Sequence, residues 1–530
     1  MIDAANTPHV LADRRHLWAF AGGCLAVTAG VVLHLPMYWM GRDMGFRLAD
    51  MAMDAGMLWG MVLIVAGLVV AGYGLLPRTL GAGHGAADAA VVVSAPEDAP
   101  LGAAHWRLMI VLTIALVIDV MKPASLGFVV PGMRAEYAVS AATVAWLPFA
   151  ALCGTVVGSV LWGWLADLYG RRASILLSAV MFVGTSICGA MPSLWWNVGM
   201  CFLMGAAAGG MLPVTYALLA ETMPSKQRGW ALVLVGGLGA AGGYLAASAL
   251  SAWLVPVFSW RILWFLNLPT GLALIFLNVF IPESPKFLLA LGRIREAHVV
   301  LRRFGCIVRE VGAGAMAAAD TRGDVARLAV PTAFVAQTVA LSIAAIAWGL
   351  INFGLLLWMP AHLVAKGYSM GVSSGLLAAS ALIAVPTVFV AAWLYSRWSS
   401  KGALVGAIAL CGAGLVGLIH LEMSSPANAS PVLVIALLIV GINGIIAMLL
   451  PYAAESYPLQ VRGRATGWVA ACTKAGGLAA QLLGLLGLVP GLAAAAALAL
   501  VPVLIALFLV VRYCTETRGR DLRDLENRSV

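Results

Sequence analysis

Charged residues are scarce in this chain of 530 residues: Lys, Arg, Asp and Glu make up 10% of it, whereas 62% is hydrophobic. A water-soluble fold is excluded because so few polar side chains cannot cover its surface. The net charge is +9, but no long basic run interleaved with aromatic residues occurs, which argues against nucleic acid as a partner. The composition therefore predicts a polytopic membrane protein with lysine and arginine gathered in its cytoplasmic loops.

Catalytic and metal-binding signatures are also scarce. The sequence contains neither H-E-x-x-H nor G-x-x-x-x-G-K-[ST], so a zinc protease and an ATP-driven pump are disfavoured. The eight cysteines are scattered without a C-x-x-C pair, and we expect no disulfide framework. His34 with Met37, Met40 and Met44 has helical spacing, but methionine is common as a gap filler in apolar cores. We therefore expect no enzyme activity, no cofactor and no metal site.

Long apolar runs predict an all-α protein with about fourteen membrane-spanning helices. Twelve of them form two blocks of six, and two extra helices precede these blocks. We expect the two extra helices in residues 1–77, a flexible cytoplasmic linker in 78–104, a six-helix bundle in 105–281, a central cytoplasmic loop in 282–332, a second six-helix bundle in 333–513 and a cytoplasmic tail in 514–530.

The two blocks of six repeat one another. The pattern E-x-x-P-x-x-x-R-G begins at Glu221 and again at Glu455, an offset of 234 residues. The triplet PES around Glu283 is matched by TET around Glu516, with an offset of 233 residues. Because two independent motifs share nearly the same offset, the sequence indicates an internal duplication.

A short charged stretch, GWLADLYGRR at residues 163–172, lies between two long apolar runs. Irregular backbone is tolerated at a membrane surface, so we predict a tight loop in which Gly163 and Gly170 allow close approach and positive φ. Arg171 and Arg172 place this loop in the cytoplasm. The corresponding stretch of the second half has Ser396 where the first half has Asp167.

The pattern G-x-L-A-D-x-x-G-R-R resembles the loop after the second helix of the major facilitator superfamily. The E-x-x-P-x-x-x-R-G pair, PESPK at 282–286 and TETRGR at 515–520 are similar to its sugar-porter and metabolite:proton symporter branch. The resemblance covers about residues 105–522 and implies two six-helix bundles that tilt about a central site.

The resemblance also implies a cytoplasmic gate of ion pairs that break when the central site opens inward. Its residues would be Gly163, Asp167, Gly170, Arg171, Arg172, Glu221, Arg228, Glu283, Glu455, Arg462 and Glu516. The alternative is that these residues serve as helix caps and as positive-inside determinants.

The sequence departs from the family pattern in two places. Many proton-coupled relatives have an arginine in the fourth helix where this chain has Cys201, so proton coupling through that arginine is excluded. Drug:proton antiporters resemble each other in a G-P-x-x-G pattern, and the residues 239–242 lack its proline. A symporter is therefore favoured over an antiporter.

Ionisable residues inside membrane helices are costly, so each of them is a functional candidate. Asp119 and Lys122 are three residues apart near the middle of a predicted helix, and we predict a proton-accepting carboxylate beside a cation for an anionic solute. The alternative is a neutralised structural pair. Lys474 lies where acid:proton symporters resemble each other in having a basic residue. It is expected to contact a substrate carboxylate, unless it is a snorkelling lysine.

Weaker candidates for substrate contacts are polar residues of the second block. They are Gln337, Trp348, Asn352, Asn443 and Gln481. Each of them can equally serve as a hydrogen-bonding residue between helices. Glu221 and Glu455 are further candidates for proton coupling.

Together these features predict a secondary active transporter that carries a small organic anion or metabolite by proton symport. Its partners would be the small-molecule substrate, protons and the lipid bilayer. We expect a monomer in the inner membrane of a bacterial-type cell, with both termini cytoplasmic. The alternatives are a drug or metabolite antiporter, a sugar or polyol transporter, and a receptor that binds solute without flux.

Overall fold

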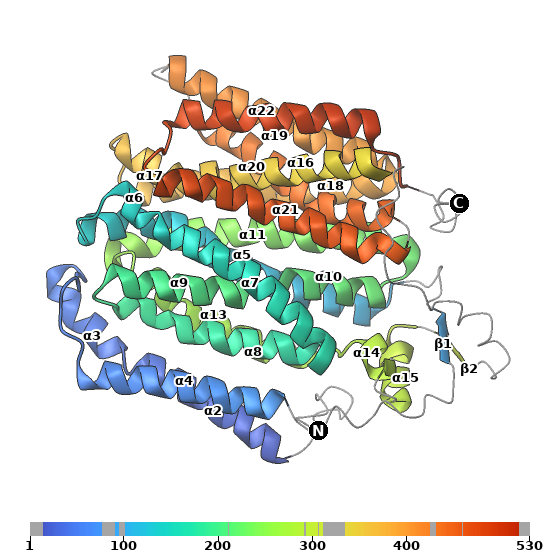
Figure 1. The fold of residues 1–530 in the computed structure, drawn as a ribbon, viewed down its shortest axis with the longest axis horizontal. Coiled ribbons are helices and arrows are strands. Elements are labelled where there is room, and N and C mark those ends of the chain that lie inside the picture. Colours follow the sequence, from blue (N-terminus) through green and yellow to red (C-terminus); the bar gives the residue numbers. More distant parts are fainter. Residues whose placement is uncertain are drawn as a thin grey trace. The chain divides into compact units, whose positions relative to one another are not determined.

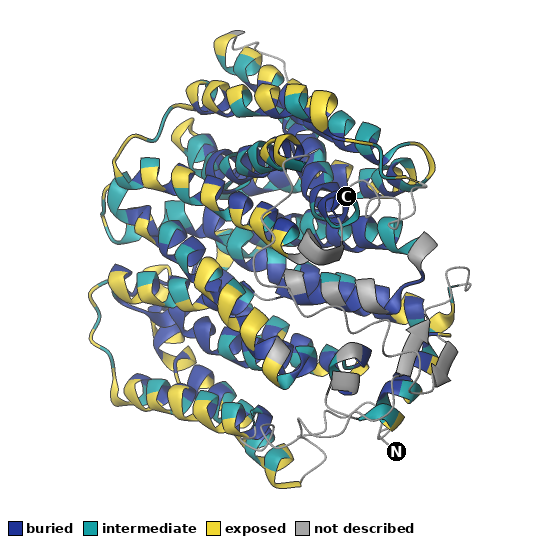
Figure 2. Cartoon of the chain, turned by 45° about the vertical axis from the view of Figure 1, so that its right-hand side comes forward, coloured by how far each residue is buried: buried dark blue, intermediate teal, exposed yellow. Residues whose placement is uncertain are grey.

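The computed structural model describes residues 14–76, 91–94, 101–209, 211–290, 293–305, 307–310, 334–424, 431–457 and 459–518. Within these residues the chain is almost entirely helical (Figure 1). Twelve helices are long and apolar enough to cross a membrane. Many large apolar residues on these helices are exposed, as expected where a helix faces lipid. Figure 2 marks the exposed residues along the helices in yellow. The protein is therefore a multi-pass membrane protein.

The elements have the following bounds. The first part of the chain forms α2 (Arg14–Val32), α3 (Leu35–Met40), η2 (Gly41–Met44), α4 (Ala55–Leu75), β1 (Val91–Ser94), α5 (Ala103–Glu136), α6 (Ala141–Val144), α7 (Trp146–Tyr169), α8 (Arg171–Gly184), η4 (Thr185–Ala190), α9 (Leu194–Ala208), α10 (Met211–Thr222) and α11 (Ser225–Phe258). The second part forms α12 (Ile262–Phe265), α13 (Asn267–Leu277), η5 (Asn278–Phe280), α14 (Pro285–Ala290), α15 (Ile294–Arg303), β2 (Ile307–Glu310), α16 (Val335–Leu350), η8 (Ile351–Leu355), α17 (Leu356–Ala365), α18 (Met370–Arg397), α19 (Ser400–Ser424), α20 (Pro431–Ser456), α21 (Leu459–Leu485) and α22 (Leu492–Tyr513).

Two helical regions inside the predicted six-helix bundles are not among the twelve. In the bundle predicted at 105–281, one region is divided between α9, which has 15 residues, and α10, which has 12. In the bundle predicted at 333–513, the other is α21, a helix of 27 residues that carries Lys474 and Gln481. Those two polar side chains lower the hydropathy of α21, and they are also two of the predicted substrate contacts.

Contacts divide the chain into two compact units. Unit 1 consists of Met1–Ile118, Gly154–Ala231 and Arg261–Asp324, and unit 2 of Asp119–Cys153, Leu232–Trp260 and Val325–Val530. The predicted extra helices α2 and α4 belong to unit 1. The predicted substrate contacts Lys122, Trp348, Asn352 and Lys474 all belong to unit 2.

Within unit 1, α2 and α4 form an antiparallel hairpin that packs through glycines. A Cβ atom at Gly67 would lie 2.7 Å from the Gly23 carbonyl oxygen and 2.9 Å from the Val27 amide nitrogen. A Cβ atom at Gly60 would lie 2.7 Å from the Gly30 carbonyl oxygen. Small residues let the two backbones approach closely, which is how helices associate in lipid without a hydrophobic driving force.

The hairpin is attached to the rest of unit 1 at several places. Both of its helices contact α8. Near η2, the Tyr38 and Phe265 ring centroids are 4.9 Å apart, and the Asp50 amide donates to the Pro192 carbonyl at 3.3 Å. We infer that the hairpin is an integral part of unit 1.

Two connecting segments differ from the expectation of irregular structure. The linker at 78–104 contributes β1, which pairs antiparallel with β2 from the central segment at 282–332. That central segment also contains α14 and α15. The two strands are distant in sequence, and the linker is rich in alanine, glycine and proline. No local sequence pattern therefore indicates that these strands pair.

The glycine seam of the hairpin allows a matched test. Gly67→Ala should lower the melting temperature of the purified protein, because overpacking a close contact costs about 1 to 3 kcal/mol. Gly72→Ala on the same helix should leave stability unchanged or raise it, since a Cβ atom there would meet nothing within 4 Å and alanine favours helix. Equal melting temperatures for the two variants would show that the seam contributes nothing to stability.

Candidate functional site

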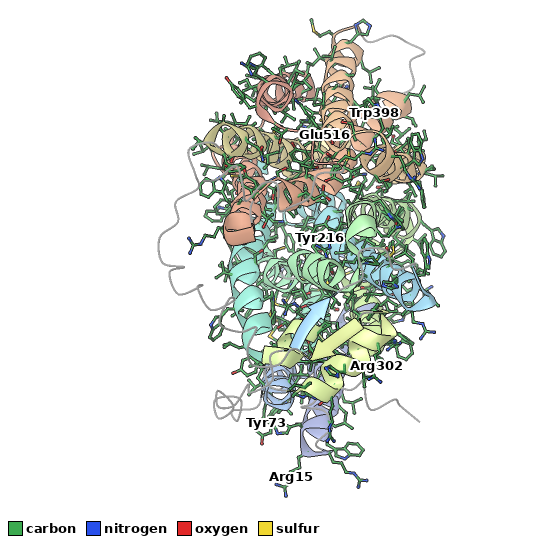
Figure 3. All side chains as sticks on the ribbon, turned by 90° about the vertical axis from the view of Figure 1, so that its right-hand side faces the viewer. Arg15, Tyr73, Tyr216, Arg302, Trp398 and Glu516 are labelled. Atoms are coloured by element: carbon green, nitrogen blue, oxygen red, sulfur yellow. The ribbon has the colours of Figure 1, made fainter. Side chains whose placement is uncertain are left out.

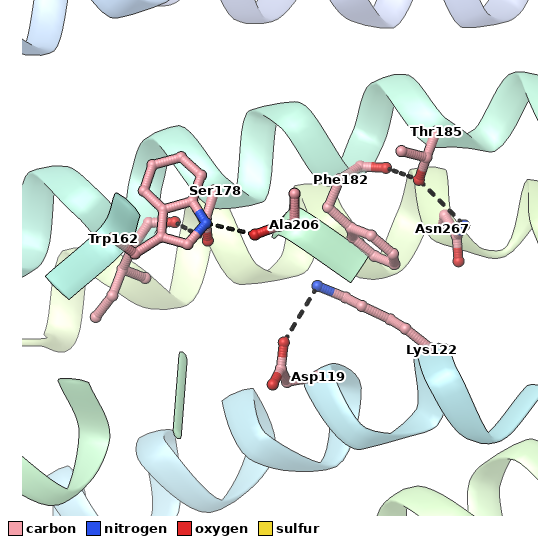
Figure 4. Close-up of polar contacts among 9 residues, drawn as sticks. Asp119, Lys122, Trp162, Ser178, Phe182, Thr185, Ala206 and Asn267 are labelled. Carbon is pink, nitrogen blue, oxygen red and sulfur yellow. Dashed lines mark hydrogen bonds and ion pairs between the residues drawn. The ribbon is translucent and has the colours of Figure 1, made fainter. Parts of the chain in front are cut away.

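The centre of the candidate site is a buried ion pair on α5. The Asp119 carboxylate and the Lys122 ammonium lie 3.6 Å apart (Figure 4), and their side chains are 9% and 1% exposed. The spacing of three residues places both groups on the same face of the helix. Removing two charges from water is unfavourable unless they compensate each other, so the pair neutralises two of the charges buried in unit 2.

A second cation belongs to the same cluster. The Lys474 ammonium on α21 is close enough to interact electrostatically with Asp119, and it lies over the Phe353 ring at 5.2 Å from the centroid. Among the described residues, this cluster thus combines two ammonium groups with one carboxylate. A single negative charge on a ligand would balance it.

An aromatic surface adjoins the cations. The Phe353 and Trp348 rings pack edge to face with centroids 5.6 Å apart, and both side chains are buried. Trp348 donates its indole N–H to the Ile442 carbonyl at 3.0 Å, so this donor already has a partner within the protein. Trp348 can therefore offer a ligand its ring but not its hydrogen-bond donor.

The helix that carries this surface is irregular. Between α16 and α17 the chain forms one turn of π-helix, η8, which holds both Asn352 and Phe353. Such turns are rare and often occur at functional sites. Asn352 is half-buried there. Neither the turn nor Phe353 was predicted, because an apolar residue inside an apolar run gives no signal of its own.

The other predicted polar contacts have separate positions. Gln481 on α21 donates its amide to the Phe353 carbonyl, so it supports η8. Asn443 follows Ile442 on α20, and its side-chain nitrogen has no partner among the described residues. Gln337 is eleven residues before Trp348 on α16, about 16 Å along the helix axis, and is therefore remote from the cluster.

Tyr244 is a further buried polar residue of unit 2 that no sequence pattern indicated. It lies on α11, whose Gly243 approaches Val120, the residue next to Asp119, so closely that a Cβ atom would be 2.6 Å away. Its hydroxyl is buried without a partner among the described residues, and its ring is 6.1 Å from that of Phe128. Tyr244 is thus a candidate hydrogen-bond donor on a helix that packs against α5.

In unit 1, the predicted gate residue Glu283 caps a helix. Its carboxylate accepts from the Arg171 amide at 2.9 Å, at the first residue of α8, and from the Ser284 amide at 3.0 Å. Gly170 has φ +97° and directly precedes α8, and a Cβ atom there would lie 2.6 Å from the Glu283 carboxylate. Burial raises the pKa of the Glu283 carboxyl, and these backbone amides oppose the rise.

Arg172, the second arginine of the predicted loop, is buried within unit 1. Its guanidinium donates to the Asn278 carbonyl at 3.1 Å, and the Asn278 side chain donates back to the Arg172 carbonyl at 3.0 Å. This reciprocal pair joins the start of α8 to η5. Arg172 also interacts electrostatically with Glu283, so the structure brings these two predicted gate residues together.

Unit 2 contains the equivalent cap. The Glu516 carboxylate accepts from the Ser400 amide at 2.9 Å, at the first residue of α19, and from the hydroxyls of Ser399 and Ser400. Figure 3 shows Glu516 near Trp398, which precedes these serines. The glutamates of PES and TET thus occupy the same place in the two halves, in agreement with the predicted repeat.

Glu455 belongs to the same cluster in unit 2. It accepts from the Tyr395 hydroxyl at 2.7 Å and from the Thr517 hydroxyl at 3.1 Å. These donors are neutral, whereas Glu283 also interacts electrostatically with Arg171. The described contacts thus fit helix caps, and the ion-pair gate stays a prediction.

The predicted loop at 163–172 is shorter than expected. Helix α7 continues to Tyr169 and α8 begins at Arg171, so Gly170 alone connects them. Gly163 lies inside α7, where a Cβ atom would meet nothing within 4 Å, and the predicted need for a glycine there is wrong. Arg228 lies near the start of α11. The side chains of Asp167, Glu221 and Arg462 lie outside the described part of the chain.

One short pattern could be mistaken for a catalytic motif. G-x-S-x-G, which marks the nucleophile of many serine hydrolases, occurs at residues 367–371. Its serine, Ser369, accepts from the Val372 amide at 3.3 Å as the N-cap of α18. The capping role accounts for Ser369, so the pattern does not indicate a hydrolase.

Glu516 gives the cap a predicted pH dependence. Burial alone would raise the pKa of its carboxyl, but the surrounding hydroxyl and amide donors lower it to about 2. Because this value is below the ordinary value of about 4.3, the stabilisation is complete above that pH and is lost as the pH falls through the folded-state pKa. Glu516→Gln should therefore lower the melting temperature near neutral pH, and its difference from the wild type should shrink in acid.

The control for that measurement is Asp43→Asn, which changes an exposed carboxylate in η2. Its melting temperature should follow that of the wild type across the pH range. A constant difference between Glu516→Gln and the wild type at every pH would contradict the capping role of the carboxylate.

Comparisons with known proteins agree with these features. The family model for the Major Facilitator Superfamily matches residues 108–481. The niacin transporter NiaP of Acinetobacter baylyi is 27% identical over 74% of this chain and 89% of its own length. The 4-hydroxybenzoate transporter PcaK of the same organism is 26% identical over 73% and 86%.

Solved structures agree on the fold. The proton:xylose symporter XylE bound to 6-bromo-6-deoxy-D-glucose covers 80% of this chain and 99% of its own length, with a TM-score of 0.64 and 17% identity. The partially occluded, inward-open xylose transporter XylE from E. coli has a TM-score of 0.62 and 15% identity, over 79% of this chain and 100% of its own length. At this identity the likeness concerns the fold and not the substrate.

Proposed function

Because the chain belongs to the Major Facilitator Superfamily, we propose that it is a proton symporter for a small organic anion. Membership in this family makes it a transporter of small molecules and not an enzyme. Within that class, the anion is an aromatic carboxylate, and the direction is uptake across the inner membrane.

The observation that carries the proposal is the charge of the buried cluster. Lys122 and Lys474 provide two positive charges, and Asp119 provides one negative charge. A carboxylate ligand would restore neutrality and would gain charge-assisted hydrogen bonds to an ammonium group. A neutral sugar would leave the second cation uncompensated.

The same cluster can couple the movement of the anion to that of a proton. When Asp119 is ionised, it holds Lys122 at 3.6 Å. When Asp119 takes up a proton, the cluster loses its negative charge, and the two ammonium groups attract the carboxylate of the substrate more strongly. Proton and anion therefore increase each other's affinity, which is the thermodynamic requirement for their joint movement.

The names of the relatives and the residues around the cations both support the proposed substrate class. Relatives named for niacin and 4-hydroxybenzoate carry aromatic carboxylic acids. A further relative is named as a benzoate transport protein. In this chain the cations adjoin the rings of Phe353 and Trp348, which can pack edge to face with a substrate ring.

The proposed architecture follows the sequence analysis. We propose fourteen spans, with the twelve apolar helices joined by α21 and by α9 with α10, and bundles within residues 105–281 and 333–513. Both termini are proposed to be cytoplasmic, and the transporter is proposed to act as a monomer. Within unit 1, the cap at Glu283 would hold the first turn of α8, and within unit 2, the cap at Glu516 would hold the first turn of α19.

The test uses purified protein in liposomes with an imposed pH gradient. Benzoate and nicotinate should accumulate when the outside is acidic, whereas benzamide and nicotinamide should not, because the amides lack the negative charge. Binding without flux would favour a receptor. Exit of solute against inward proton movement would favour an exporter, and xylose uptake with no response to acids would favour a sugar transporter.

A further inference from the structure

We propose that Phe353 selects for an aromatic ring on the transported acid and that Gln481 positions Phe353 for this task. The proposal rests on the proposed function, since it concerns the same cationic site. It assigns a selective role to an apolar residue and a positioning role to a residue that the sequence analysis treated as a ligand contact.

One face of α21 holds Phe353 in three ways. Lys474, Gly477 and Gln481 follow one another at spacings of three and four residues, so they share a face of the helix. The Lys474 ammonium lies 5.2 Å from the centroid of the Phe353 ring. At Gly477, a Cβ atom would lie 2.7 Å from the Phe353 ring, so only glycine leaves room for it.

Gln481 provides the third contact, which is to the backbone. Its side-chain nitrogen donates to the Phe353 carbonyl, and the side chain is fully buried. A π turn shifts the register of helix hydrogen bonds, so a side-chain donor can satisfy a carbonyl that the helix leaves underused. Gln481 therefore stabilises η8 at the residue whose ring faces Lys474.

The ring of Phe353 has a defined orientation. Trp348 packs edge to face against it at an interplanar angle of 87°, and Trp348 is itself fixed by its bond to the Ile442 carbonyl. The Phe353 ring partly compensates the Lys474 charge through a cation–π contact. A substrate carboxylate replaces that compensation, and an attached aromatic ring can pack against the ring of Phe353.

An aliphatic acid would behave differently. It could supply the same carboxylate to Lys474, but its ring or chain lacks the polarised edge and face that favour aromatic pairs. Phe353 should therefore contribute to the preference among acids and little to the binding of the carboxylate itself. Packing alone would instead make Phe353 important for all acids equally.

The test compares benzoate with cyclohexanecarboxylate, which share a carboxylate and are close in size. The wild type should bind benzoate more tightly. Phe353→Leu should reduce that preference about three- to tenfold, whereas the affinity for cyclohexanecarboxylate should stay within about twofold. Phe353→Tyr should keep the preference, because it retains the ring.

Positioning is tested by a double-variant cycle. Gln481→Leu should reduce the preference for benzoate as Phe353→Leu does, and the double variant should show no further loss, because both act through the same ring. Ser380→Ala is the control, since Ser380 also donates to a backbone carbonyl across helices, that of Val432 at 3.0 Å. Its preference should equal that of the wild type.

Each outcome decides one point. If the wild type binds the two acids equally, ring selection is wrong while the anion site stands. If the losses in Phe353→Leu and Gln481→Leu add, Gln481 does not act through Phe353. If no carboxylate binds to the wild type, the proposed function fails and this inference fails with it. If Phe353→Leu does not fold, the preference for benzoate is compared between Gln481→Leu and Phe353→Tyr instead.

Discussion

Asp119→Asn should abolish accumulation of the acid against its gradient when an inward proton gradient is imposed. Asparagine is nearly isosteric with aspartate but cannot bind and release a proton. Without that titrating group, the binding of the anion is no longer linked to the proton, so the gradient has no means of driving uptake. The measurement is benzoate uptake into liposomes with and without an acidic exterior.

The same variant should still exchange benzoate at equilibrium across the membrane. The exchange of labelled for unlabelled acid requires alternating access but no net proton movement, and a permanently neutral residue 119 resembles the protonated state. The positive charge of Lys122 would also attract the anion, since residue 119 at 3.6 Å would carry no negative charge to compete. Retained exchange together with lost accumulation separates a coupling role from a general loss of folding.

A matched control lies on the same helix. Glu136, near the end of α5, accepts from the Trp260 indole N–H at 2.9 Å and lies 17 residues beyond Asp119. Glu136→Gln should keep gradient-driven uptake, because the glutamine can still accept that bond. If Asp119→Asn keeps full accumulation, the proton carrier is another residue, and Glu455 and Glu221 are the next to test.

The sequence predicted the charged residues of the membrane helices. Placing a charge in lipid is energetically unfavourable, so a charged residue inside an apolar run indicates a functional role. Asp119, Lys122 and Lys474 were predicted on this basis. The structure brings these three residues into one cluster in unit 2. The duplication was equally visible, because its motifs contain charges and glycines at fixed spacing.

The sequence could not predict features that depend on contact between distant segments. The π turn η8 has no periodicity that distinguishes it from an α-helix, and Phe353 is one of many apolar residues around it. Gln481 was found as a polar residue, but its partner is a backbone carbonyl 128 residues away. Gly163 was misjudged for a related reason: a glycine in a motif can lie inside a helix with open space beside it.

Lys474→Gln should weaken the binding of benzoate by about 1 to 3 kcal/mol, the usual range for the loss of a charge-assisted hydrogen bond. This corresponds to roughly five- to a hundredfold in the dissociation constant. The loss should be much smaller for benzamide, which has no charge for the ammonium to compensate. The measurement is the dissociation constant of each ligand for purified wild type and variant.

Lys401→Gln provides the control for charge. Lys401 lies on α19, and its ammonium donates to the Val511 carbonyl at 2.7 Å in an exposed position. Removing this cation lowers the net charge by the same amount but leaves the buried cluster intact, so the affinity for benzoate should not change. If Lys401→Gln and Lys474→Gln weaken binding equally, the effect arises from net charge and not from a site.

The pair of ligands decides between two kinds of substrate. If Lys474→Gln weakens the binding of benzoate but leaves that of benzamide nearly unchanged, the second cation of the cluster compensates a substrate carboxylate. If the preference between acid and amide is the same in wild type and variant, Lys474 does not contact the charge. In that case Lys474 would be balanced by Asp119 and the ring of Phe353 alone, and a neutral substrate such as a sugar or polyol would fit the site better than an anion.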